Sequence, residues 1–94
     1  MTQEQKERCE RINALHNGFE YGSPDIDAMS EFINLTGYLM HSVNHGMLVL
    51  RYKHFLTLKQ ESAKIKLWDE MLRHAKGVYL EISRSSPCSD LGGM

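Results

Sequence analysis

Apolar and small residues recur at steps of three and four through the central part of the chain. They are Ile26, Met29, Ile33, Thr36, Met40, Val43, Met47 and Leu50. A repeat of 3.5 residues is typical of a helix that buries one seam against a neighbour. The residues just before it, Ser23-Pro24-Asp25, are of the types that begin helices. The pattern predicts a long central helix over about 24–45.

Two other stretches have helical spacing. A first helix is expected over 3–17, where Thr2 and Gln5 can form a capping box and only a narrow apolar stripe is present. A final helix is expected over 59–84. Its seam consists of Ile65, Trp68, Leu72, Ala75, Tyr79 and Ile82. We expect Trp68 and Ile33 to be core residues, because both lie on these seams.

The segment 47–58 is ambiguous, because its apolar residues partly alternate as they would in a strand. A lone strand needs a partner, and the chain has no second strand-like run. We therefore interpret the segment as helical. It either continues the central helix or begins a new helix after Gly46.

Together these patterns predict an all-α protein, a small bundle of three or four helices built on a long antiparallel helical hairpin. Residues 1–86 would form the single domain, and residues 87–94 a disordered tail. Both long helices carry apolar residues beyond their seams, more than the first helix can cover. Either the chain folds back near Gly46, or a second copy forms a homodimer that covers them.

Composition and charge narrow the classes of function. The chain has 94 residues and a formal net charge of -1, whereas generic nucleic-acid and membrane-surface binders are strongly basic. It has no apolar leader and no run of about 20 apolar residues, so we expect no membrane contact and a cytoplasmic location. In a reducing cytosol Cys9 and Cys88 would remain thiols.

One helical face has an unusual composition. At 100° per residue, Tyr38, His41, His45, Leu48 and Tyr52 fall together, nearly opposite the seam of the same helix. Tyrosine is enriched at interface hot spots, so we interpret these five residues as a candidate partner-binding stripe. In the alternative interpretation, the first helix or the segment 50–58 covers the stripe.

A basic segment suggests a second type of partner. Basic and aromatic residues interleave from residue 51, as they do in proteins that bind phosphates and stack on bases. The candidate phosphate contacts are Arg51, Lys53, Lys59, Lys64 and Lys66. The segment could also be an ordinary solvated face that the acidic N-terminal helix neutralises.

Motifs for catalysis, cofactor binding or metal binding are absent from the sequence. His41 and His45 are four residues apart, as two helical metal ligands would be, but no further ligands are identifiable. We therefore expect no catalytic residues, no cofactor and no metal. The expected function is that of a small adaptor, regulator or inhibitor that docks on a larger protein, with helical nucleic-acid binding as the alternative. In size and lack of motifs the chain is similar to the small accessory proteins of bacteriophages and mobile elements.

Overall fold

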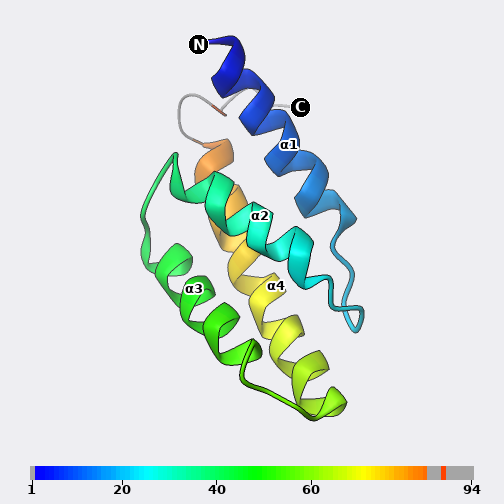
Figure 1. The fold of residues 1–94 in the computed structure, drawn as a ribbon. Helices are drawn as coiled ribbons and strands as arrows, with labels where there is room; N and C mark the ends of the chain where they lie inside the picture. The colour runs from blue at the N-terminus through cyan, green and yellow to red at the C-terminus, as the bar shows by residue number, and fades with distance from the viewer. Residues whose placement is uncertain (1, 85–87, 89–94) are drawn as a thin grey trace.

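The computed structural model describes residues 2–84 and residue 88. These residues form four helices and no β-strand: α1 (Gln3–Gly18), α2 (Ile26–Gly37), α3 (Val43–Phe55) and α4 (Glu61–Ser83) (Figure 1). The predicted all-α class is confirmed. None of these helices is long and apolar enough to cross a membrane.

The main contacts between the four helices form a ring, in which each helix packs on two others. α3 and α4 lie side by side as a hairpin, joined by the turn at residues 56–60 (Figure 1). α2 contacts α3, while α1 contacts both α2 and α4. Because each helix presents an apolar face to its neighbours, the buried side chains form one cluster between the helices.

The start of α1 follows the sequence closely. Thr2 Oγ1 accepts a hydrogen bond from the backbone N–H of Gln5 at 3.1 Å, and Gln5 Oε1 accepts one from the backbone N–H of Thr2 at 3.1 Å. This reciprocal pair is the predicted capping box, and it satisfies two backbone donors that the helix cannot satisfy itself.

The central helix predicted over 24–45 is wrong as a single element. α2 ends at Gly37, residues 38–42 form a link, and α3 begins at Val43. Glycine weakens the end of α2, and Ser42 begins α3 by accepting the backbone N–H of His45 at 3.1 Å. The segment 47–58, whose sequence pattern is ambiguous, is helical as far as Phe55. The new helix begins three residues before Gly46, which lies inside α3.

The core is centred on α4. Trp68 is fully buried, as predicted, and its Nε1–H donates to the carbonyl oxygen of Glu20 at 2.8 Å. That hydrogen bond fixes the loop between α1 and α2 against α4 and satisfies the indole donor. Ile33, also predicted as core, is only half-buried and packs against the edge of the cluster.

A polar contact fixes α3 on α4. Asn44 Nδ2 donates to Glu81 Oε1 at 2.9 Å, and His74 Nδ1 donates to Asn44 Oδ1 at 3.3 Å. The Asn44 side chain lies over Gly77, where an added Cβ would be only 2.7 Å from Nδ2. The glycine in α4 therefore provides the space for this contact.

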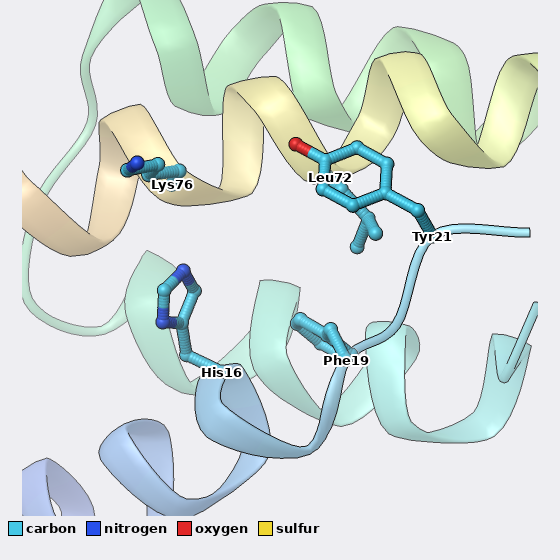
Figure 2. Close-up of a pocket in the computed structure, with 5 residues that line it drawn as sticks. All are labelled: His16, Phe19, Tyr21, Leu72 and Lys76. Atoms are coloured by element: carbon cyan, nitrogen blue, oxygen red, sulfur yellow. The ribbon is translucent and has the colours of Figure 1, made fainter. Parts of the chain in front are cut away.

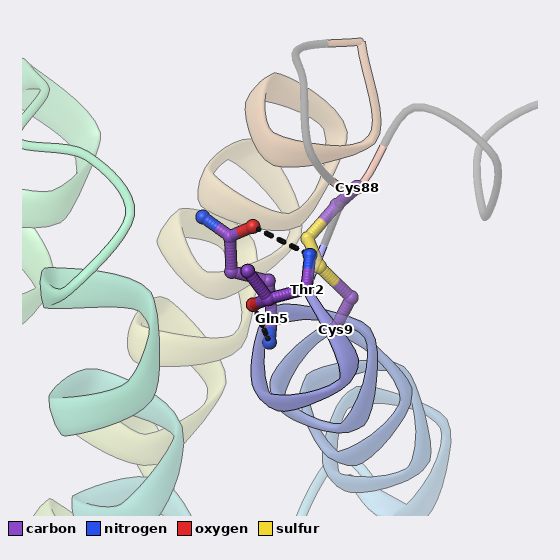
Figure 3. The surroundings of a disulfide bond; sticks show 4 residues. All are labelled: Thr2, Gln5, Cys9 and Cys88. Atoms are coloured by element: carbon purple, nitrogen blue, oxygen red, sulfur yellow. Dashed lines mark hydrogen bonds between the residues drawn. A yellow bond between two sulfur atoms is a disulfide. The ribbon is translucent and has the colours of Figure 1, made fainter.

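The cysteines are bonded to each other. A disulfide joins Cys9 on α1 to Cys88, and both residues are buried (Figure 3). The expectation of free thiols is wrong, because the fold brings together two residues 79 positions apart. The disulfide does not support the expected cytoplasmic location, because disulfides persist mainly in oxidising compartments. The other residues of the expected disordered tail, 87 and 89–94, lie outside the described part of the chain.

The contact over Gly77 predicts a coupled pair of substitutions. Gly77→Ala favours helix by about 1 kcal/mol but displaces Asn44, whose two hydrogen bonds are worth about 0.5–1.5 kcal/mol each. In wild type we expect Gly77→Ala to lower the free energy of unfolding by up to about 2 kcal/mol. In the Asn44→Ala background the same substitution should raise it by about 1 kcal/mol. Urea unfolding of the four variants measures this cycle.

Gly46 provides the matched control, because nothing lies within 4 Å of a Cβ added there. Gly46→Ala should stabilise both backgrounds by about 1 kcal/mol. Equal stabilisation of wild type by Gly77→Ala and Gly46→Ala would contradict the proposed crowding.

The disulfide predicts a dependence of stability on redox state. Joining residues 79 apart restricts the unfolded chain, so reduction should lower the free energy of unfolding by about 2–4 kcal/mol. Urea unfolding with and without dithiothreitol measures the effect. The Cys9→Ser/Cys88→Ser variant is the control and should not respond to reductant; a wild-type midpoint unchanged by reductant would show that the bond does not form.

Candidate functional site

α3 has two apolar faces, and only one is buried. His45, Leu48, Tyr52 and Phe55 lie on the inward face, where Leu48 is 0% and His45 7% exposed. On the opposite side, Val43, Met47 and Leu50 are 80%, 36% and 66% exposed. His54 continues this row by one turn. We call Val43, Met47, Leu50 and His54 the outward row; the spacing i, i+4, i+7, i+11 places them on one side of the helix.

The outward row corrects the sequence prediction. Val43, Met47 and Leu50 belong to the predicted seam and were expected to be buried. Because the chain breaks at residues 38–42, α3 is not bound to continue the rotational phase of α2. It turns its other face towards α2 and α4, which leaves Val43, Met47 and Leu50 of the predicted seam in solvent.

The five residues of the candidate stripe do not form one surface. Tyr38 and His41 lie in the link and are exposed, with the guanidinium of Arg8 at 4.8 Å from the Tyr38 ring centroid. His45 and Leu48 are buried, and Tyr52 is half-buried. The α3 part of the stripe is thus covered, but by α2 and α4 and not by the first helix or the segment 50–58 that the alternative interpretation named.

His45 also connects two helices. Its Nε2 lies 3.1 Å from the carbonyl oxygen of Ile33 on α2, so this nitrogen carries the proton and donates. Its ring also lies close to Gly37, at the end of α2. A residue that the sequence suggests for partner binding therefore holds α3 against α2.

The candidate phosphate contacts lie along the α3–α4 hairpin. Lys53, Lys59 and Lys66 are exposed, whereas Lys64 and Arg51 are half-buried. Arg51 Nη1 donates to the carbonyl oxygen of Met47 on its own helix at 3.3 Å. Residues 32–60 contain no aspartate or glutamate. The outward row therefore lies on a segment with basic residues and no acidic ones.

A small hollow adjoins the end of the outward row. It has a volume of about 220 Å³ and lies between the end of α3 and the start of α4. Its walls are formed by His54, Leu58, Ala63, Lys66, Leu67 and Glu70. Because His54 belongs to both features, the row and the hollow form one continuous surface.

A second cavity, of about 200 Å³, lies between α1, the following loop and α4 (Figure 2). It is lined by His16, Phe19, Tyr21, Leu72 and Lys76. The His16 ring is stacked on Tyr79, with ring centroids 4.2 Å apart. Burial, and to a smaller extent the charge of Lys76, lowers the pKa of His16. The cavity is smaller than the roughly 300–1,000 Å³ of drug-sized ligand sites.

Metal-binding side chains are not gathered in the part of the chain that the structure describes. No group of three or more histidine, cysteine, aspartate or glutamate side chains is placed to hold a metal ion there. The rings of His41 and His45 lie 5.9 Å apart, nearly at right angles. The outward row, with its hollow, is the candidate functional site.

Sequence reasoning assigned Val43, Met47 and Leu50 of the outward row to the core and found neither hollow. A local signal for the break was present, since Gly37 is followed after a few residues by Ser42, a residue type that begins helices. A helix boundary between them would have separated the rotational phases of α2 and α3.

Burial of His16 predicts a dependence of stability on pH. A lowered pKa means that the folded protein prefers the neutral ring, so His16 contributes stability above about pH 6.5, the ordinary value for histidine. That contribution is lost as the pH falls through the folded-state pKa. We expect His16→Phe to reduce the loss of stability between about pH 7.5 and pH 5, measured by urea unfolding. His54→Phe, at an exposed histidine, is the control; the same pH profile for wild type and His16→Phe would contradict the assignment.

Comparison with known proteins supplies no template for this site. The chain matches no protein-family model, no curated protein and no solved structure. The interpretation of the outward row therefore rests on its own geometry and charge.

Proposed function

We propose that the chain is a non-enzymatic binding protein, an adaptor, regulator or inhibitor that docks on a larger protein through the outward row of α3. The observation that carries the proposal is the exposure of Val43, Met47 and Leu50 in line on one helix. Single exposed apolar residues are common, whereas contiguous exposed apolar surface marks interaction sites.

The opposite face of α3 supports this proposal. His45, Leu48 and Phe55 are buried, and Asn44 bonds to α4, so the outward row stands on a helix held along its length. A site on a rigid helix loses little conformational entropy on binding. We infer that the four helices act as a small bundle whose role is to present this row.

Nucleic-acid binding is the less favoured alternative. Phosphate contacts need lysine or arginine side chains free to reach the backbone, but the centre of the proposed surface is apolar. Arg51 folds back onto its own helix, and the net charge of the chain is -1. Strong retention on heparin, falling steeply with salt, would favour this alternative.

Neutral substitutions test the proposal without changing the charge. Val43→Gln with Leu50→Gln should reduce affinity for a captured protein partner at least about thirtyfold, the effect of losing about 2 kcal/mol of hot-spot contacts. Unfolding should be unaffected, because both side chains are exposed. The measurement is affinity capture from an extract of the native cells, identification by mass spectrometry, and titration of the purified partner.

Leu80→Gln is the matched control, because Leu80 is an exposed leucine on α4. It should leave binding unchanged. Loss of the partner with Leu80→Gln but not with the double variant would place the docking surface on α4 and refute the proposal.

A further inference from the structure

We propose that the outward row receives an amphipathic helix with acidic flanks, contributed by the partner protein. This inference rests on the proposed function and names the chemistry of the partner at the same surface. The shape of the row, the adjoining hollow and the distribution of charge support it.

The shape of the row favours a helix. From Val43 to His54 the row extends about 16 Å, or three helical turns, at 1.5 Å per residue. A straight row of apolar side chains on one helix packs against a similar row on another, with anchors at i, i+3, i+4 and i+7. An extended peptide would instead add to the edge of a sheet, and the described residues form no sheet.

The hollow provides a place for an anchor. It is walled by Leu58, Ala63 and Leu67, and His54 joins it to the row. A helix lying along the row would reach the hollow with one large apolar side chain. Anchors of this kind, seated in a pocket near the rest of the contact, carry much of the energy of helix-in-groove complexes.

The charge near the row favours acidic flanks. Lys53 is exposed on α3, and Lys59 and Lys66 are exposed on the turn and on α4. None of the three forms an ion pair within residues 2–84. Within the hollow Lys66 and Glu70 balance each other, but residues 43–60, which form α3 and the following turn, carry Arg51, Lys53 and Lys59 and no acidic residue. Carboxylates on the docked helix would complement them.

The same charges argue against a second copy of the chain as the occupant. α3 carries Arg51 and Lys53 and no acidic residue. Pairing the outward rows of two copies would bring together basic segments that contain no acid over residues 32–60. An acidic partner helix removes this repulsion, whereas a second α3 does not.

Two synthetic peptides test the inference on the oxidised 94-residue chain. Each has about 18 residues, the same helical row of leucine with one phenylalanine, and flanks of either glutamate or lysine. Fluorescence anisotropy should give at least about tenfold tighter binding of the glutamate peptide, with a difference that shrinks as salt rises. Amide chemical-shift changes on binding should be concentrated at residues 43–58 and at the α4 residues that line the hollow, Ala63, Leu67 and Glu70. Leu50→Gln should weaken binding of the glutamate peptide.

Charge reversal isolates the role of the lysines. Lys53→Glu with Lys59→Glu should abolish the preference for the glutamate peptide or invert it. Lys6→Glu with Lys76→Glu, at exposed lysines on α1 and α4, changes the net charge by the same amount; this control should leave the preference unchanged.

The alternative outcomes separate this inference from the proposed function. Equal affinity for both peptides at residues 43–58 overturns the acidic partner but leaves docking on α3 intact. Binding of neither peptide at up to about 1 mM, or shifts confined to other helices, overturns the helix as occupant. A dimer in sedimentation that Leu50→Gln dissociates replaces the partner helix with a second copy. Capture of the same protein partner by wild type but not by the Gln variants would still support the proposed function in each case.

Discussion

The packing of α3 on α4 is the contact on which the rest of the structure depends. Leu48 is buried between the helices, and Asn44 bonds to His74 and Glu81 over the space that Gly77 leaves open. A side chain at Gly77 would occupy the position of Asn44. These contacts determine how α3 is rotated about its axis, and the rotation decides which of its two apolar faces meets solvent.

The remaining helices complete the cover of α4. α1 is held there by stacking of His16 on Tyr79, by a hydrogen bond from Tyr79 Oη to Asn13, and by the disulfide between Cys9 and Cys88. α2 is joined to α1 by the bidentate ion pair of Arg11 and Glu31, which is exposed and contributes little by itself. A chain of 94 residues has a modest core, so a covalent link across 79 positions is a large addition to its stability.

The proposed function rests on the difference between the two sides of α3. One side of α3 is used entirely for stability, through Leu48, Phe55 and the His45 contact to Ile33. On the other side Val43, Met47 and Leu50 are exposed, although they are as apolar. Exposed apolar surface tends to aggregate unless a partner covers it, and we propose that the basic residues near this row restrict which partners can do so.

The sequence by itself determined what depends on near neighbours. The capping box of Thr2 and Gln5, the helical spacing around Trp68 and the all-α class all arise from residues a few positions apart. The orientation of α3 does not, because Val43, Met47 and Leu50 on one face and Leu48, Tyr52 and Phe55 on the other are both apolar rows with helical spacing. Periodicity identifies such rows but cannot tell which of them is buried. The 3.5-residue repeat also passes through the break at 38–42 without interruption. Only packing on α2 and α4 selected the buried face, and only the closed fold brought Cys9 to Cys88, since these contacts depend on the tertiary structure.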